Sequence, residues 1–308
     1  MLPEPKLRDP LLLAVWPGMG GVASGAGYYL MAKLGMHLMM EFPADEIFDV
    51  EQIKVKDGLI VTRRLPRSRL FLWRDENRSH DIILFIGDAQ PPSRGSAFCR
   101  KLIAYVRELG VKKVFTFAAM ATRMRPEHHS QVFGAAIDRG TLGRFEELGM
   151  HVFEDGKISG LNGVLLGVAA ESGMTGGCLL GEIPSVFSQI PFPKASLAVL
   201  EMFTRMEGIE IDFTELRTHA RTVDATLEIF LKRMEQSAEE VEAEEAAENQ
   251  TERATPRPAN SDKQRIDGLF EEVRKDRSKA YGLKQELDRL GLFSEYEDRF
   301  LDLFKEPE

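Results

Sequence analysis

Two patterns of hydrophobic positions alternate along the first two thirds of the chain. Short, almost wholly apolar runs are followed by longer segments whose apolar residues recur every three or four positions. The runs predict buried strands and the spaced segments predict amphipathic helices, so the alternation predicts an α/β fold with a mainly parallel central sheet. The predicted strands are Leu11–Trp16, His37–Phe42, Leu70–Trp73, Ile82–Ile86, Val114–Phe117, a short one near Val152, and Cys178–Leu180 continuing to Pro184. The predicted helices are Val22–Leu34, Ser96–Leu109, Thr141–Leu148 and one that includes Gly163–Ala170.

A separate hairpin is predicted between Ile53–Val55 and Leu59–Thr62. The two runs are joined through Lys56-Asp57-Gly58, and an Asp-Gly pair supplies the positive φ angles of a type I′ turn. Gly35, directly after the helix Val22–Leu34, occupies the position of a C-cap glycine.

Beyond Pro193 the strand pattern stops and helical spacing continues. The predicted helices are Ala195–Met206, Phe213–Met234 and Ile266–Leu290, the last closed by Gly291 and followed by the short apolar-rich segment Phe293–Phe304. The second and third carry apolar seams spaced alternately by three and four, which suit packing of helix on helix. Both a coiled coil and helices packed on the main domain fit these seams, although Asp276 at a seam position weakens the coiled coil.

The distribution of charge predicts the domain boundaries. The chain has 308 residues, 43% of them hydrophobic, which is enough for a sizeable core. Its net charge is −9, and seven glutamates within residues 237–252, with no basic residue among them, leave −2 for the rest. We therefore expect an α/β domain over 10–236, a solvated, Pro-containing linker over 237–261, and a helical segment over 262–305.

Composition also disfavours several classes of protein. No basic stripe is present, which disfavours nucleic-acid binding, and no run approaches the roughly 18 apolar residues of a membrane helix. Residues 1–10 lack the apolar core of a signal peptide. Cys99 and Cys178 lie in apolar surroundings without a partner motif, so we expect buried free thiols and a cytoplasmic protein.

The most unusual segment is Gly156–Pro184, in which eight of 29 residues are glycine where average usage gives about two. It also contains the apolar run Gly163–Ala170. Glycine beside buried aliphatic residues indicates a tightly turning backbone, or close approach by a ligand, another helix or another subunit. The sequence leaves these possibilities open.

One glycine turn matches a relaxed dinucleotide fingerprint. Gly18-x-Gly20-x-x-Ala23 follows a predicted strand and opens a predicted helix, and Glu41 lies about where a ribose-binding acid is expected. Backbone N–H groups at Gly18, Gly20 and Gly21 are therefore candidates to hold phosphate. The alternative is a structural turn that needs glycine for its backbone angles.

Two further loops follow predicted parallel strands and should share one edge of the sheet. The first, Gly87–Gly95, offers Asp88 for a hydroxyl and Arg94 for an anion; the second offers Arg123 and Arg125. Together they predict an anion pocket, with solvent-exposed turns as the alternative.

The strong catalytic signatures are absent from the sequence. There is no G-x-S-x-G elbow, no G-x-x-x-x-G-K-[ST] phosphate loop, and neither an H-E-x-x-H helix nor a cysteine pair at metal spacing. We expect no catalytic residue, no metal and no cofactor. Glu171 and Glu182 flank the glycine-rich segment, and capping of backbone N–H groups is the expected role, with Glu182 the better functional candidate of the two.

Four motifs fall in an order that resembles the proteasome assembly chaperone 2 family, in its bacterial and archaeal branch. They are Pro17-Gly18-Met19-Gly20, Ser159-Gly160-Leu161-Asn162-Gly163-Val164-Leu165, Leu180-Gly181-Glu182-Ile183-Pro184, and Ala195 with Val199-Leu200-Glu201. The resemblance covers about residues 10–235, and Glu297-Asp298-Arg299-Phe300-Leu301 is similar to the helical tail of some bacterial members. It marks Gly160, Asn162, Gly163, Glu182 and Pro184 as structural motif residues. Asn162 is the first of these to test, because asparagine tolerates left-handed backbone and bonds its own turn.

The resemblance implies a three-layer α/β/α sandwich, phosphorylase/hydrolase-like, with a C-terminal helical extension. It also implies a homo-oligomer, a trimer or larger, that acts as a non-catalytic assembly chaperone or scaffold for a proteasome-like or other protein client. Some relatives end in a tail whose penultimate tyrosine enters proteasome pockets; here that position is Pro307, so direct activation is not expected. Relatives have carried an ATP-grasp label, for which this chain shows no residue set. The alternative function is an enzyme or nucleotide binder of phosphorylase-like architecture.

Overall fold

The computed structural model describes residues 7–42, 48, 54–61, 65–74, 80–91, 94–252, 260–276, 279–290 and 292–303. The chain divides into two compact units, Met1–Arg233 and Met234–Glu308. The boundary lies within the long helix α6 (Thr214–Glu252), so α6 contributes to both.

The first unit is built on an eight-stranded sheet with the order β2-β5-β6-β1-β7-β10-β8-β9. The strands are β1 (Leu11–Val15), β2 (His37–Phe42), β5 (Ser68–Trp73), β6 (Ile82–Gly87), β7 (Lys113–Thr122), β8 (Val132–Ala136), β9 (His151–Val152) and β10 (Thr175–Pro184). The four central strands, β6, β1, β7 and β10, are parallel. On one side β5 and β2 are added antiparallel, and on the other β8 pairs antiparallel with β10 and parallel with β9.

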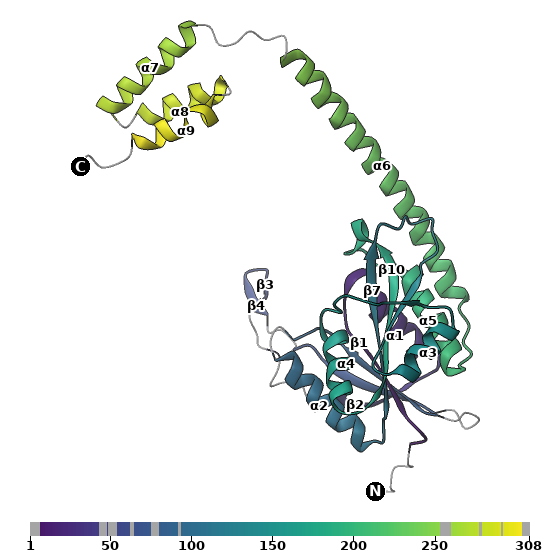
Figure 1. The fold of residues 1–308 in the computed structure, drawn as a ribbon. Helices are drawn as coiled ribbons and strands as arrows, with labels where there is room; N and C mark the ends of the chain where they lie inside the picture. The colour runs from purple at the N-terminus through teal and green to yellow at the C-terminus, as the bar shows by residue number, and fades with distance from the viewer. Residues whose placement is uncertain are drawn as a thin grey trace. The chain divides into compact units, whose positions relative to one another are not determined.

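Helices cover both faces of this sheet (Figure 1). On one face α1 (Val22–Lys33), α5 (Pro193–Glu207) and the start of α6 share a core with Leu11, Leu13 and Val15 of β1. On the other face α2 (Gly95–Glu108) and α4 (Leu161–Glu171) share a core with Leu12, Ala14 and Trp16. Successive residues of a strand point to opposite faces, so a fully apolar run fills both cores. The three-layer α/β/α fold expected from the sequence is confirmed.

Smaller elements complete the first unit. Helix α3 (Arg139–Glu147) packs beside β8 through the buried ring of Phe145. Two short 3₁₀ turns, η1 (Met19–Gly21) and η2 (Ser185–Phe187), follow β1 and β10. The predicted hairpin is present as a separate two-stranded sheet, β3 (Lys54–Lys56) and β4 (Leu59–Val61), with positive φ at Asp57 and Gly58 as the type I′ turn requires.

The second unit contains α7 (Asn260–Lys275), α8 (Ala280–Arg289) and α9 (Phe293–Asp302). Their shared core is formed by Ile266, Phe270, Val273, Ala280, Leu283, Leu287 and Phe300. The prediction of one helix over Ile266–Leu290 is wrong, because helix α7 ends at Lys275 and a second helix, α8, begins at Ala280. Asp276 occupies the next seam position, and a carboxylate is costly to bury in an apolar core. The backbone carbonyl of Asp276 instead accepts the Lys279 N–H at 3.1 Å, in the turn between the two helices.

The segment predicted as an irregular linker, 237–261, is helical for most of its length. Helix α6 continues to Glu252, residues 253–259 lie outside the described part, and α7 begins at Asn260. Glutamate and alanine dominate residues 237–252. Both have high helix propensity, which favours a helix over these residues.

Candidate functional site

The carboxyl edge of the parallel strands is organised by one side chain, Gln90, in the loop after β6. Its Nε2 donates to the Pro17 carbonyl at 2.8 Å, and its Oε1 accepts the Leu161 N–H at 3.0 Å. Gly160, which precedes α4, has a φ of +73°, and a Cβ there would lie 2.4 Å from Gln90 Oε1. The Gln90 amide therefore caps α4 in place of a side chain at Gly160, and it ties the first glycine turn to the second.

The turn after β1 adopts the conformation that its glycines permit. Gly20 and Gly21 have φ values of +60° and +59°. The Gly20 N–H donates to the Ser188 carbonyl at 2.7 Å and the Gly21 N–H donates to the Gly18 carbonyl at 3.0 Å, whereas a Cβ on Gly18 would meet no atom within 4 Å. Two of the three N–H groups proposed for phosphate are therefore bonded to backbone carbonyls.

The acid of the dinucleotide fingerprint lies elsewhere in the sheet. Glu41 is on β2, which is separated from β1 by β5 and β6. Its carboxylate pairs with Arg67 at 3.6 Å. A dinucleotide site places the second strand beside the first, so the structure does not bring Glu41 to the Gly18–Gly21 turn.

The four residues of the predicted anion pocket are not brought into one cavity among the described residues. Asp88 accepts the Arg67 N–H at 3.0 Å and pairs with Arg69 at 3.3 Å, which closes the end of the β5–β6 pair. Arg94 is exposed at the N-cap of α2, and Arg123 is exposed after β7. Arg125 pairs with Glu127 at 2.7 Å and lines a small depression with it and Glu228.

Glu182 on β10 holds neighbouring strands together. One carboxylate oxygen accepts the Thr122 hydroxyl at 2.7 Å and the other accepts the Gln131 N–H at 3.2 Å. Its backbone carbonyl accepts the Ser130 hydroxyl at 2.6 Å. These contacts join the end of β7 and the segment before β8 to β10, which ends at Pro184. The arrangement is that of a structural carboxylate.

Asn162 does not adopt the left-handed backbone that asparagine tolerates. Asn162 lies in the first turn of α4, and the positive φ belongs to Gly160 two residues earlier. The Asn162 side chain is 5% exposed, and its Oδ1 has no hydrogen-bond partner among the described residues. Its backbone carbonyl accepts the Thr116 hydroxyl at 3.1 Å, which links α4 to β7.

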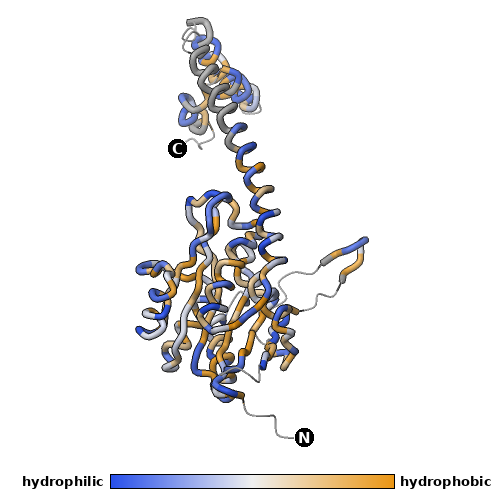
Figure 2. Tube along the Cα trace, turned by 90° about the vertical axis from the view of Figure 1, so that its right-hand side faces the viewer, coloured by the Kyte–Doolittle hydropathy of each residue, from blue (hydrophilic) through white to orange (hydrophobic). Residues whose placement is uncertain are grey.

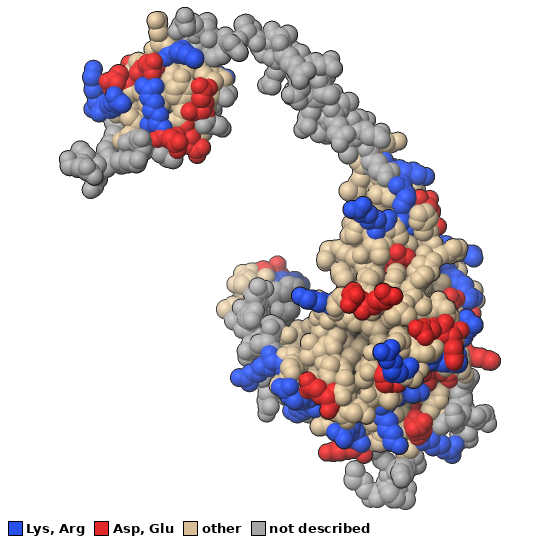
Figure 3. Space-filling view, viewed as in Figure 1, with Lys and Arg blue, Asp and Glu red and all other residues tan. Residues whose placement is uncertain are grey.

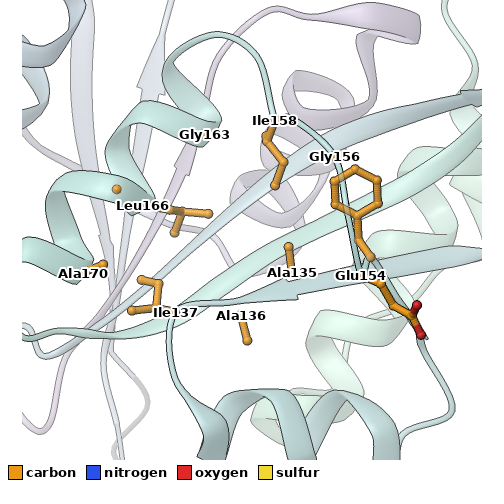
Figure 4. A pocket seen from close by; sticks show the side chains of 11 residues that line it. Ala135, Ala136, Ile137, Glu154, Gly156, Ile158, Gly163, Leu166 and Ala170 are labelled. Atoms are coloured by element: carbon orange, nitrogen blue, oxygen red, sulfur yellow. The ribbon is translucent and has the colours of Figure 1, made fainter.

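The glycine-rich segment forms one wall of a groove of about 440 Å³ (Figure 4). Helix α4 supplies Gly163, Leu166, Gly167 and Ala170, and the loop before α4 supplies Phe153, Glu154, Gly156 and Ile158. The end of β8 supplies Ala135 and Ala136, and Ile137 follows it. A Cβ on Gly163 would lie 2.1 Å from the Ile158 carbonyl oxygen, whereas one on Gly167 would meet nothing within 4 Å. Glu154 is the only ionisable residue of this lining, so the groove offers shape and apolar surface rather than an acid–base pair.

Both cysteines are buried free thiols, as predicted. Burial raises the pKa of the Cys99 thiol to about 12 and that of the Cys178 thiol to about 12. Within the described residues, no three His, Cys, Asp or Glu side chains gather closely enough to hold a metal ion. No helix in that part of the chain combines the length and apolar character needed to cross a bilayer. On the face of the first unit seen in Figure 3, acidic and basic side chains are intermixed around an uncharged area.

Comparison with known proteins assigns the family. The PAC2 family profile matches residues 12–231. The chain belongs to the PAC2 family. A protein of Methanocaldococcus jannaschii described only as uncharacterized is 26% identical over 249 residues, which cover 79% of this chain and 91% of that protein.

Solved structures of PAC2 proteins share the fold. PbaB of Pyrococcus furiosus, an archaeal proteasome activator, is 25% identical with a TM-score of 0.63, over 75% of this chain and 96% of that one. The Mycobacterium tuberculosis proteasome-assembly chaperone homologue Rv2125 is 22% identical with a TM-score of 0.60, over 70% of this chain and 93% of that one. The family resemblance found in the sequence motifs is therefore confirmed. The first three motifs lie at the glycine turns and strand ends described above, and the fourth lies in α5.

Proposed function

We propose that this PAC2 protein is a non-catalytic homo-oligomer, a trimer or larger, that acts as an assembly chaperone or interaction scaffold for a protein client. The observation that carries the proposal is that polar groups at the carboxyl edge of the sheet form hydrogen bonds within the fold. Gln90, Glu182 and the Gly20 N–H are each engaged in bonds between segments of the fold. In enzymes of open α/β architecture, groups at this edge are free to meet substrate.

An exposed apolar surface supports a protein partner. The edge patch consists of Met19, Val186, Ile190, Ile229 and Phe230, all exposed. The Gly20–Ser188 hydrogen bond joins its first two segments, and the Phe187 ring lies 6.1 Å from the Phe230 ring. Exposed apolar groups gathered in one place are typical of protein interaction sites. PbaB, which shares the fold, is an archaeal proteasome activator, and a proteasome-like client in the cytoplasm is the corresponding proposal here.

A ligand screen separates this proposal from the enzyme alternative. Thermal unfolding of the full chain is measured with phosphate, nucleosides, nucleotides and dinucleotides over a concentration series. A ligand that binds the folded state raises the melting temperature by mass action. We expect no concentration-dependent rise. A rise that is lost in Arg94→Ala or Arg123→Ala, with unchanged melting of the unliganded variant, would contradict the proposal and locate a binding site.

A capture experiment tests the client. The tagged chain is recovered from a native lysate and its partners are identified by mass spectrometry, with Phe230→Asp as the matched variant. We expect a protein recovered with the parent chain and lost with the variant, because a charge on the edge patch must be desolvated on binding. Equal recovery by both would contradict a role for the patch.

A further inference from the structure

The hairpin β3–β4 exposes three large aliphatic side chains. Val55, Leu59 and Ile60 are 63%, 71% and 71% exposed, and none belongs to a core cluster of the described residues. The hairpin forms a sheet of its own, with strands of three residues. Figure 2 shows hydrophobic residues on it away from a polar turn. An isolated two-stranded hairpin is marginally stable in water, so these side chains need a covering surface.

A groove in the first unit has matching chemistry. The α1–α5–α6 groove, of about 360 Å³, is lined by Gly20, Gly21, Gly25, Tyr28, Tyr29, Ala32, Pro191, Phe192, Pro193, Ser196, Leu216 and His219. The Ser196 hydroxyl donates to the Val22 carbonyl at 3.1 Å, and the Tyr29 hydroxyl donates to the Asp212 carbonyl at 2.8 Å. These two donors are therefore used inside the fold, and the groove presents mainly rings, prolines and glycine backbone. Such walls suit aliphatic side chains better than a polar ligand.

The groove is continuous in sequence with the edge patch. Met19 of the patch directly precedes Gly20 of the groove, and Ile190 directly precedes Pro191. The Phe192 N–H donates to the Gly20 carbonyl at 2.8 Å, which holds the two segments together. An occupant of the groove would therefore extend over surface already proposed for protein contact.

The charges beside the groove complement those of the hairpin. Asp212 and Glu215 have side chains 63% and 75% exposed, and both pair with Lys33, at 3.8 Å and 2.9 Å. Arg217 is a further basic neighbour of Asp212, and its guanidinium pairs with Glu201 at 2.6 Å. Within the hairpin, residues 54–61 carry two lysines and one aspartate, and Lys56 at the turn is exposed. A basic hairpin against an acidic rim fixes the orientation of a contact and disfavours mismatched partners.

We propose that the hairpin of one copy of this chain inserts into the α1–α5–α6 groove of a second copy. Val55 and Ile60 are a directly opposed cross-strand pair, so both point to one face and enter the groove together. Hairpin and groove are different surfaces, so the contact is heterologous, and its repetition closes a ring when the rotation permits. This inference rests on the self-association in the proposed function and names the surfaces that produce it.

Cross-linking between two variants tests the contact directly. Full-length Ile60→Cys and Tyr28→Cys proteins are mixed at micromolar concentration, oxidised mildly and examined without reductant. Tyr28 lines the groove and is 47% exposed, while the native Cys99 and Cys178 are buried and stay unreacted. We expect a cross-linked dimer in the mixture, several-fold above either variant alone. In the control mixture, Tyr281→Cys replaces Tyr28→Cys. Tyr281 lies on α8, outside the groove, and is 71% exposed, and we expect no such increase there.

Substitutions that change the charge of the hairpin test whether the hairpin contributes to assembly. Native mass spectrometry compares the parent chain with Ile60→Asp and with Lys56→Glu, the latter also combined with Glu215→Lys. We expect each single variant to weaken self-association at least about tenfold with unchanged circular dichroism and melting, and the combination to recover part of the loss.

The possible results separate the two proposals. A parent chain that is monomeric throughout contradicts the proposed function and this inference together. An oligomeric parent that Ile60→Asp leaves intact contradicts the hairpin contact alone. Cross-linking of Ile60→Cys with itself but not with Tyr28→Cys would show hairpins pairing with each other, which also overturns the inference.

Discussion

At the scale of single residues, Gln90 connects parts of the chain that are remote in sequence. Its two hydrogen bonds span 73 and 71 positions, to Pro17 and Leu161. We predict that Gln90→Ala lowers the free energy of unfolding by about 1–2 kcal/mol, because it leaves the first N–H of α4 without its cap. Chemical denaturation of the full chain measures the change.

Asn162→Ala is the matched control for Gln90→Ala, since both remove an amide beside the start of α4. The Asn162 Oδ1 has no partner among the described residues, so its removal leaves no hydrogen bond broken at that atom. We expect it to reduce stability less than Gln90→Ala does. An equal or larger loss would show that the amide at 162 has a role the geometry does not explain.

The carboxyl group of Asp138 makes the stability of the fold depend on pH. Burial disfavours its charge, but hydrogen bonds from the Thr141 N–H and hydroxyl and from the Gly176 N–H outweigh this and lower the pKa of the carboxyl. A lowered pKa stabilises the fold above the unfolded value of about 3.9, and that stability is lost as pH falls through the folded value. Asp138→Asn keeps only one acceptor oxygen, so it should be about 1 kcal/mol less stable than the parent at neutral pH.

This difference should narrow as the pH falls below about 4, where the parent carboxyl becomes protonated. Urea denaturation of both proteins over a pH series measures it. A difference that stays constant over the whole series would mean that the charge of Asp138 contributes nothing.

Residue roles were the least predictable part of the sequence. Gln90 has no pattern around it, and its importance follows only from partners that the fold brings to it. Asparagine and glycine both tolerate positive φ, and the sequence alone does not say which of Gly160 and Asn162 adopts it. The positive φ lies at Gly160, directly before the start of α4.

At the scale of elements, replacing either of two glycines of α4 with alanine should change stability in opposite directions. Gly163 faces the Ile158 carbonyl so closely that a Cβ would lie 2.1 Å from its oxygen, and Gly167 faces open groove. Gly163→Ala should destabilise the protein, because backbone must shift to admit the methyl group. Gly167→Ala should stabilise it by about 0.5–1 kcal/mol through helix propensity alone.

Thermal and chemical denaturation of this matched pair measures the two signs. If both substitutions stabilise the protein, the close approach at Gly163 is not a constraint. If Gly167→Ala leaves stability unchanged or raises it while reducing partner binding, the groove beside α4 is a binding surface.

The elements themselves were well predicted where burial dictates the pattern. The central strands are uninterrupted apolar runs because both faces are covered, and Asp57-Gly58 specified the hairpin turn. Boundaries failed where packing is weak. The acidic end of α6 is helical without an apolar pattern, and Asp276 ended a helix that the spacing alone would have continued.

At the scale of the whole molecule, strand order was beyond the sequence. The dinucleotide fingerprint assumes that the second strand lies beside the first, but β5 and β6 separate β2 from β1. This pairing depends on contacts between distant residues, which local patterns do not encode. The family motifs did carry that information, because their order along the chain matched proteins with this fold.

The proposed function is that of a self-associating scaffold whose polar groups at the carboxyl edge are engaged within the fold. Sedimentation velocity of the full chain over a micromolar concentration series tests it most directly. The account predicts a discrete species of three or more copies, whose proportion increases with concentration. Sedimentation as a single chain at every concentration would contradict it.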